Sequence, residues 1–222
     1  MKNEVHCLIS AGPTREWLDP VRFISNPSSG KMGYALANEA NARGFKVTLV
    51  SGPVTLPCPS GVERIMVNTA VEMNEVMAQH FPASSITIMS AAVCDHRPKV
   101  FHEQKIKKDK VSESIELVSN PDILLNLGRS KRMDQILVGF AAETENHIAH
   151  AKIKLQQKNL DWIAVNNVSG NQGFESDDNE ITLISNDEQS IIFEKEDKIS
   201  LAKKILDPVS YTHLTLPTIL LV

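Results

Sequence analysis

The connection from Ala11 to Gly30 contains the residue types of an anion-binding loop. It carries Ala-Gly-Pro-Thr-Arg-Glu at residues 11–16 and Ser-Asn-Pro-Ser-Ser-Gly at residues 25–30. When a strand leads through a glycine- and serine-rich loop into a helix, free backbone N–H groups and the positive helix end point to one place. Such glycines are also common in tight turns that only pack a helix on a sheet, but a length of roughly twenty residues favours function. The residues that we expect in this phosphate loop are Gly12, Ser28, Ser29 and Gly30.

A second candidate site is Ser-Ala-Ala-Val-Cys-Asp-His-Arg at residues 90–97, at the end of a predicted central strand. In open α/β sheets the ligand crevice lies outside the carboxyl ends of the strands, so small residues there let a ligand approach the backbone. Asp95 is placed to hold a hydroxyl group or a hydrated metal ion. The alternative is that Asp95 and Arg97 are loop charges that pair with each other. Cys94 and His96 receive no role, because no third group is evident to orient a catalytic pair.

Lysines form the third candidate site, in the polar stretch Lys-Ile-Lys-Lys at residues 105–108. Ammonium groups suit a triphosphate or pyrophosphate, although a run of lysines is usually a solvated surface. Lys154 and Lys158, one helical turn apart, form a further phosphate-binding pair, and Phe140 at a strand end is able to stack on a base. For these last three residues the ordinary explanations, a solvent-facing helix and a core aromatic side chain, are stronger.

These segments are positioned by short apolar runs that alternate with amphipathic runs of helical length. The alternation predicts an α/β fold with a mainly parallel sheet and helices on both faces. Thr69 and Glu72 have the spacing of a capping box, and Asn120 before Pro121 is predicted to cap the third helix. The predicted strands are residues 5–10, 46–50, 86–91, 135–141 and 161–165, and the predicted helices are residues 31–42, 69–80, 121–127 and 145–157.

The C-terminal part of the chain departs from this alternation. It is predicted to form a β-hairpin followed by a closing helix that ends at Pro208. Residues 208–222 show neither the helical nor the strand period, so we expect an atypical tail outside a domain of residues 1–207. The predicted hairpin strands are residues 180–185 and 190–194, and the closing helix is residues 198–206.

The bulk composition narrows the class of protein. A length of 222 residues favours one domain, and a formal net charge of -4 gives no basic excess for binding nucleic acid. Three cysteines at irregular spacings match neither a disulfide framework nor a metal knuckle, which fits a reducing compartment. No apolar run approaches the roughly 20 residues of a bilayer-spanning helix, and the first residues contain no export signal. We expect a soluble, cytoplasmic protein with no nucleic acid or membrane partner.

Taken together, the motifs closely resemble the synthetase half of bacterial bifunctional phosphopantothenoylcysteine decarboxylase/synthetases. The resemblance runs in family order over roughly residues 5–206, and a shared order of six unusual motifs is far more specific than a glycine pattern. The longest motif covers residues 11–33 and includes Val-Arg-Phe-Ile-Ser-Asn. The others are Ala-Ala-Val-x-Asp-x-Arg at 91–97, Lys-Ile-Lys-Lys at 105–108, Asn-Pro-Asp-Ile at 120–123, Gly-Phe-Ala-Ala-Glu-Thr at 139–144 and Lys-Asn-Leu-Asp at 158–161.

This resemblance implies a Rossmann-like fold, a homodimer, and a ligase that joins 4'-phosphopantothenate to L-cysteine with CTP and Mg²⁺ in coenzyme A synthesis. The substrate carboxylate attacks the α-phosphate of CTP to give an acyl-cytidylate and pyrophosphate, and the amine of cysteine then displaces CMP. Positioning and cations matter most in such a reaction, which agrees with a chain that offers no convincing nucleophile. Relatives usually carry a flavin-dependent decarboxylase, so we expect a fused or separate decarboxylase as a partner.

The resemblance also implies roles for individual residues. Asn26 matches the asparagine that handles the acyl intermediate, Arg22 matches an arginine near the phosphopantothenate site, and Lys105 matches the lysine tied to cytidylate formation. Magnesium is expected on the CTP phosphates, with Asp95 as its candidate protein ligand. The implied nucleotide site consists of Ala91, Ala92, Asp95, Lys105, Asn120, Pro121, Asp122, Ile123, Phe140, Lys154 and Lys158.

Two alternatives belong to other classes of protein. A short-chain-dehydrogenase-like oxidoreductase needs a Tyr-x-x-x-Lys dyad, and neither Tyr34 nor Tyr211 is followed by lysine four residues later. The second predicted strand is followed by Ser51, Gly52 and Pro53, without the acidic residue that holds the ribose of NAD. The other alternative is a non-catalytic nucleotide-binding module, should the atypical C terminus prevent dimer assembly.

Overall fold

The computed structural model describes residues 4–107, 114–143, 147–167 and 178–215. An eight-stranded sheet forms its centre, in the order β12-β11-β10-β9-β6-β1-β4-β5. β11 pairs antiparallel with both β10 and β12, and the other pairs are parallel, which confirms the predicted α/β fold with a C-terminal hairpin. The strands are β1 (His6–Ala11), β4 (Lys46–Ser51), β5 (Glu63–Met66), β6 (Ile86–Met89), β9 (Ile136–Glu143), β10 (Trp162–Asn167), β11 (Asp178–Ser185) and β12 (Ser190–Asp197).

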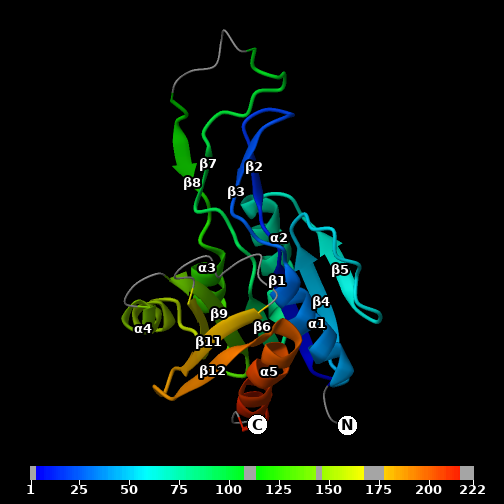
Figure 1. The fold of residues 1–222 in the computed structure, drawn as a ribbon, viewed down its shortest axis with the longest axis vertical. Helices are drawn as coiled ribbons and strands as arrows, with labels where there is room; N and C mark the ends of the chain where they lie inside the picture. Colours follow the sequence, from blue (N-terminus) through cyan, green and yellow to red (C-terminus); the bar gives the residue numbers. More distant parts are fainter. Residues whose placement is uncertain (1–3, 108–113, 144–146, 168–177, 216–222) are drawn as a thin grey trace, which may run out of the picture.

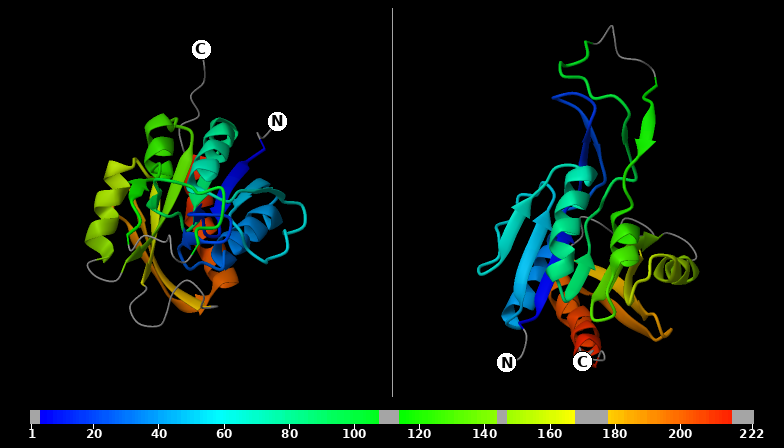
Figure 2. Two further views of the ribbon diagram at one scale, coloured as in Figure 1. Left: turned by 90° about the horizontal axis from the view of Figure 1, so that it is seen from above. Right: turned by 180° about the vertical axis from the view of Figure 1, so that it is seen from behind.

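Helices cover both faces of this sheet (Figures 1 and 2). α1 (Lys31–Ala42) and α5 (Lys198–Thr215) pack on one face. α2 (Ala70–His80), α3 (Ile123–Ser130) and α4 (His147–Gln157) pack on the other, with the short η1 (Phe81–Ala83) after α2. The central strand β1 is buried along most of its length, as a parallel strand covered on both faces requires. Among the described residues, no helix has the length and apolar character needed to cross a membrane.

The first helix lies unusually close to the sheet at Gly33. A Cβ atom on Gly33 would lie 2.5 Å from the Cβ of Ala11 and 2.7 Å from the Oγ of Ser90. Those distances are too short for any side chain, so glycine is required where α1 crosses β1. The close approach fixes the start of α1, and with it the preceding loop, at the carboxyl end of the sheet.

Two short hairpins extend from the carboxyl end of the sheet as an arm (Figure 1). β2 (Arg15–Trp17) pairs with β3 (Phe23–Ser25), and β7 (His96–Pro98) pairs with β8 (Leu117–Ser119). These four strands were not predicted from the sequence, because three residues are too few to show a period. We call residues 15–25, 96–107 and 114–119 the arm.

The predicted helix starts are partly correct. Thr69 caps α2 as expected, since its side chain accepts a hydrogen bond from the backbone N–H of Glu72 at 3.2 Å. The predicted cap of α3 is wrong: Asp122 caps this helix by accepting from the N–H of Leu125 at 3.0 Å. Asn120 is not available as a cap, because its side chain donates to the carbonyl of Cys94 at 2.9 Å.

The prediction that Pro208 ends the last helix is also wrong, because α5 continues through it to Thr215. Val209 is fully buried in the core, and the indole N–H of Trp162 donates to the hydroxyl of Thr212 at 3.2 Å. These contacts offset the roughly 3 kcal/mol that a proline costs inside a helix. Residues 208–215 therefore belong to the fold, and residues 216–222 lie outside the described residues.

Candidate functional site

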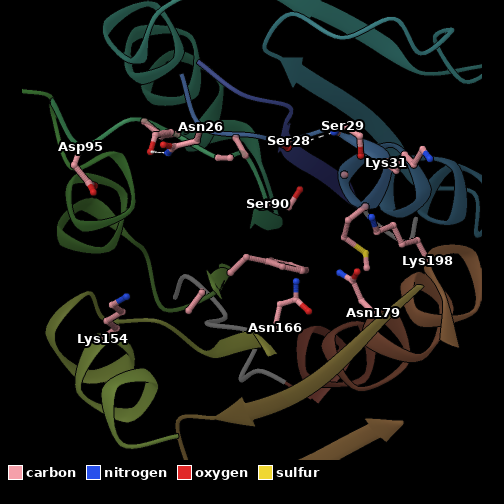
Figure 3. Close-up of a pocket in the computed structure, with 18 residues that line it drawn as sticks. Asn26, Ser28, Ser29, Lys31, Ser90, Asp95, Lys154, Asn166, Asn179 and Lys198 are labelled. Atoms are coloured by element: carbon pink, nitrogen blue, oxygen red, sulfur yellow. Dashed lines mark hydrogen bonds between the residues drawn. The ribbon is translucent and has the colours of Figure 1, made fainter. Parts of the chain in front are cut away.

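A cavity of about 340 Å³ opens at the carboxyl end of the sheet, and we call it the main cavity. The loop before α1, the segment after β6, strands β9, β10 and β11 and the start of α5 form its walls. Figure 3 shows that the cavity has two ends. The Asn26 end contains Asn26, Asp95 and Lys154, and the α1 end contains Lys31, Asn179 and Lys198.

A side cavity of about 230 Å³ adjoins the Asn26 end. It shares Ala91, Val93, Asp95 and Phe140 with the main cavity, so the two cavities have a common wall. Together they are lined by every predicted nucleotide-binding residue except Lys105. The side cavity holds Asn120, Pro121, Asp122, Ile123 and Lys158, and the main cavity holds Ala92 and Lys154.

The predicted phosphate loop borders the main cavity. Ser28, Ser29 and Gly30 line it, and the N–H of Gly30 donates to the Oγ of Ser28 at 3.3 Å. Gly30 has a φ of 75°, offers no side-chain cap, and is followed by a first helical turn without an acidic residue, so α1 keeps its positive end. Gly12 does not line the cavity; it lies behind Gly30 and its carbonyl accepts from the N–H of Ala92 at 2.9 Å.

Hydrogen bonds hold the Asn26 end in shape. The Nδ2 of Asn26 donates to the carbonyl of Val93 at 3.1 Å. The N–H of Asn120 donates to the carbonyl of Asp95 at 2.8 Å. Arg97 donates to Asn120 Oδ1 at 3.0 Å and to the Ser119 carbonyl at 2.7 Å, and among the described residues it forms no ion pair with Asp95. The expected alternative, a pairing of Asp95 with Arg97, is therefore wrong, and the carboxylate of Asp95 lines the cavity.

Lys158 is anchored at the side cavity by an ion pair. Its Nζ lies 2.8 Å from a carboxylate oxygen of Asp122, the residue that caps α3. The pair ties the end of α4 to the start of α3, on either side of the side cavity. It also explains how the Asn-Pro-Asp-Ile and Lys-Asn-Leu-Asp motifs come together in space.

Arg22 and Lys105 lie on the arm and line neither cavity of this chain. Arg22 donates to Asp19 Oδ2 at 3.0 Å and to the carbonyl of Ile106 at 3.0 Å, and the N–H of Ile106 donates to Asp19 Oδ2 at 3.2 Å. The hydrogen bonds from Arg22 hold the pKa of the buried Asp19 carboxyl well below its ordinary value. Lys105, beside this cluster, is exposed. One chain alone therefore does not bring either cation to Asn26.

The cysteines offer no reactive thiol near the site. Cys94 is buried, and its Sγ contacts the backbone carbonyls of Thr14 and Ile24. Burial raises the pKa of the Cys94 thiol, and it raises that of Cys7 to about 12. A protonated thiol is a poor nucleophile, so neither residue is a candidate nucleophile, although Cys94 lines the side cavity.

The main cavity offers one carboxylate to a metal ion. The described residues contain no group of three or more His, Cys, Asp or Glu side chains that would hold a metal by themselves. Asp95 is the one described carboxylate that lines the main cavity. Mg²⁺ commonly binds in this way, through one or two carboxylates, water and substrate phosphates.

Known proteins match this chain over nearly its whole length. The family model for the DNA/pantothenate metabolism flavoprotein C-terminal domain matches residues 2–212. The chain belongs to this family. It is 51% identical to the coenzyme A biosynthesis bifunctional protein CoaBC of Vibrio cholerae, over 79% of this chain and 45% of that protein. With the protein of the same name from Escherichia coli K12 the identity is 44%, over 92% of this chain and 51% of that protein. The chain thus spans about half the length of the curated relatives it matches.

Two solved structures share the fold of this chain. The crystal structure of the C-terminal domain of CoaBC has a TM-score of 0.81 at 39% identity and covers 94% of this chain and 95% of that one. A Cab2 mutant in complex with phosphopantothenate-cysteine has a TM-score of 0.78 at 16% identity, over 96% of this chain and 87% of that one. At that low identity the second likeness concerns the fold alone, which is the Rossmann-like fold predicted from the sequence.

Several residues of this family member line the main cavity without having been predicted. The signal for Asn166 was its position at the end of a buried strand, the same rule that selected residues 90–97. Asn179 and Lys198 follow the point where the alternation of elements stops, so no sequence rule pointed to them. The polar lining residues that were not predicted as part of a site are Lys31, Asn166, Asn179 and Lys198.

Proposed function

We propose that this chain is the ligase domain that joins 4'-phosphopantothenate to L-cysteine with CTP, in coenzyme A synthesis. In the first step a carboxylate oxygen of the acid attacks the α-phosphorus, the bond from that phosphorus to the bridging oxygen breaks, and pyrophosphate leaves. In the second step the amine nitrogen of cysteine attacks the acyl carbon, the bond from that carbon to the phosphate oxygen breaks, and CMP leaves with the electron pair. The amine releases its proton to solvent, and neither step uses a protein nucleophile.

The observation that carries this proposal is a pair of adjoining cavities: one is lined by Asn26 and the phosphate loop, and the other has the walls of a base pocket. One N–H of the Asn26 Nδ2 donates to the carbonyl of Val93, and the second N–H is then available to donate to the acyl carbonyl. The N–H groups at the start of α1 favour the negative charge of the phosphates. A donor placed at the carbonyl and positive charge placed at the leaving phosphates are what an acyl transfer of this kind needs.

The side cavity supports the binding of a nucleotide base. Ile123 and Phe140 give it apolar walls, and Asn120, Asp122 and Lys158 add polar groups at its edge. This mixture suits a flat base that stacks on one face and forms hydrogen bonds at its rim. Lys154 lies in the main cavity next to it, where we place the phosphates. Mg²⁺ would neutralise phosphate charge there, with Asp95 as its protein ligand, directly or through water.

We further propose that the active form is a homodimer in which the arm of one subunit completes the cavity of its partner. The arm exposes a group of large apolar side chains, and exposed apolar patches mark surfaces for protein contact. It also carries Arg22 and Lys105, the two residues that the family resemblance assigns to the acid and to cytidylate formation. The exposed apolar residues of the arm are Val21, Phe23, Ile24, Val100, Phe101, Ile115 and Leu117.

The names of the curated relatives support a second activity on the same pathway. They are called bifunctional, and this chain spans about half their length. We propose that a flavin-dependent decarboxylase is fused to this domain or works beside it in the cytoplasm. The oxidoreductase alternative gains no support, since the hydroxyl of Tyr34 bonds to Ser51 and Arg64 and Tyr34 does not line the main cavity.

Incubation with CTP, 4'-phosphopantothenate and cysteine tests the proposed reaction. Pyrophosphate should be released only when the acid is present, and CMP and the amide should follow when cysteine is added. A protein that binds CTP but releases no pyrophosphate with the acid would be a nucleotide-binding module, and the proposal would be wrong. Mass spectrometry of the products from a mixture of CTP and ATP identifies the nucleotide that is used.

A further inference from the structure

Two helices begin at the α1 end of the main cavity, and each has a lysine as its first residue. Lys31 begins α1 and Lys198 begins α5, and both line the cavity. Lys198 is only 6% exposed, and lysines are seldom buried to this degree. Figure 3 shows its side chain extending from the start of α5 toward the cavity. A buried amino group is thus placed in the wall of a ligand-sized space, far from the end that holds Asn26.

The N termini of the two helices differ in whether a carboxylate of the chain already caps them. Asp197 caps α5: its Oδ1 accepts from the N–H groups of Ile199 and Ser200, both at 3.0 Å. The hydroxyl of Ser200 donates to the other oxygen at 2.7 Å and lowers the pKa of Asp197. The carboxylate of Asp197 therefore already neutralises the positive end of α5, directly beside Lys198. α1 begins at Gly30 without a side-chain cap, so its N terminus still favours an anion.

Asn179 adds an independent sign of a ligand at this end. Its Oδ1 is closed off from solvent and has no hydrogen-bond partner within the part of the chain that the structure describes. Buried polar atoms of this kind are rare in folded proteins. The pairing of β11 with β12 also shifts register between Asn179 and Ile181, and such bulges re-aim side chains beside active sites. Phosphate oxygens accept hydrogen bonds, so Asn179 would bind a phosphate through the N–H groups of its Nδ2, and its Oδ1 would accept from a donor on the ligand or from a bound water.

We propose that Lys198 and Asn179 bind the β- and γ-phosphates of the nucleotide and hold the pyrophosphate as it leaves. This assignment rests on the proposed function. With the base in the side cavity and the α-phosphorus near Asn26, the remaining phosphates extend along the main cavity toward the start of α1. Negative charge grows on the pyrophosphate as its bond to the α-phosphorus breaks, and a fixed cation with helix N–H groups stabilises that charge. Lys198 and Asn179 therefore act on the leaving group, at the end of the cavity opposite Asn26.

Binding of CTP and CMP by the full chain, measured by calorimetry, tests this role. CMP lacks the two outer phosphates, so Lys198→Met should change its affinity by no more than about twofold. The affinity for CTP should fall at least about tenfold, because the variant loses one charge-assisted hydrogen bond. Lys203→Met, at an exposed position on the same helix, is the matched control and should change neither affinity. Equal loss of CTP and CMP, or unchanged CTP binding in the folded variant, would overturn the proposal.

A second set of measurements does not depend on Lys198→Met folding. In the unaltered chain, inorganic pyrophosphate should displace CTP but bind together with CMP, because the two products occupy different ends of the site. Asn179→Ala should weaken the binding of pyrophosphate and leave the binding of CMP unchanged. Asn186→Ala, at the exposed turn of the same hairpin, should change neither affinity. Competition between pyrophosphate and CMP would overturn the assignment.

These outcomes separate this inference from the proposed function. If the unaltered chain binds CTP no better than CMP and releases no pyrophosphate with the acid, the proposed function is wrong. If the unaltered chain does both and the Lys198 and Asn179 variants bind CTP and pyrophosphate normally, the ligase stands and only the role of these two residues is wrong.

Discussion

The close contact between α1 and β1 makes Gly33→Ala a sharp test of how the phosphate loop is positioned. On helix propensity alone the change should stabilise α1 by about 1 kcal/mol, because alanine is favoured over glycine inside a helix. The new Cβ would lie 2.5 Å from the Cβ and 3.1 Å from the Cα of Ala11, and neither atom is able to rotate away. It would also lie 2.7 Å from the Oγ of Ser90, which is held by a 2.6 Å hydrogen bond to the carbonyl of Ser10.

The steric cost should exceed the gain in propensity. Overpacking of a filled core costs about 1–3 kcal/mol, and contacts this short with backbone-anchored atoms belong at or beyond the upper end. We expect a net loss of about 2 kcal/mol in the free energy of unfolding, together with weaker CTP binding as α1 and the loop move from the sheet. Urea unfolding and calorimetry measure the two effects. Asn38→Ala, on the exposed face of α1, gains propensity without a clash and should stabilise slightly.

A double mutant identifies the contact that is responsible. Ala11→Gly removes the nearest atom, so Gly33→Ala should cost at least about 1 kcal/mol less in that background than in the original chain. A Gly33→Ala variant as stable as the original, or an equal cost in both backgrounds, would refute the argument that this glycine is needed for close packing.

Three further predictions concern acid stability, a buried ion pair and the shared site. The pKa of Asp19 is lowered from its ordinary 3.8, so its ionised form stabilises the fold above about pH 4, and that contribution is lost as the pH falls further. Unfolding followed by circular dichroism should therefore show that Asp19→Asn loses less stability below about pH 4 than the original chain does. Asp161→Ala removes a 2.8 Å ion pair to Lys131 and should lower the urea-derived unfolding free energy by about 3 kcal/mol, and a loss under about 1 kcal/mol would contradict this. Lys105→Gln should abolish pyrophosphate release and Asn26→Asp should impair the amide-forming step. Re-associated mixtures of the two should regain about a quarter of normal amide formation, because each mixed dimer has one intact site; no recovery would argue against a site shared between subunits.

The central sheet was readable from the sequence because its strands are long enough to show a pattern. Cys7 to Ala11 are all buried and, apart from Ser10, all apolar, as expected for a parallel strand covered on both faces. The arm strands have three residues each and are held by contacts distant in sequence, such as that of Arg22 with Ile106. The prediction that the last helix ends at Pro208 failed for a related reason. Local sequence rules end a helix at proline, but the tertiary packing of Val209 stabilises the helix beyond it.

The candidate site was predictable where its residues follow strands in a fixed order. Asn26, Asp95 and Phe140 come from segments at the ends of β1, β6 and β9, which the parallel topology brings to the same rim of the sheet. Asn179 and Lys198 reach that rim only because the antiparallel hairpin folds back beside β10 and delivers the start of α5. The hairpin itself was predicted from the sequence, but its pairing with β10 and its register shift leave no local trace there.

Arg22 and Lys105 show what the order of motifs in the sequence does not predict. A shared motif order indicates that residues serve one reaction, but it does not indicate that they lie in one copy of the chain. In the structure both residues belong to the arm, where Asp19 accepts hydrogen bonds from Arg22 and from the N–H of Ile106, the residue after Lys105. The arm also leaves the side chains of Phe23 and Phe101 partly exposed in a single chain. A second copy that buries these rings would bring the same two cations to the neighbouring cavity, so one contact would account for both the apolar surface and the missing charge.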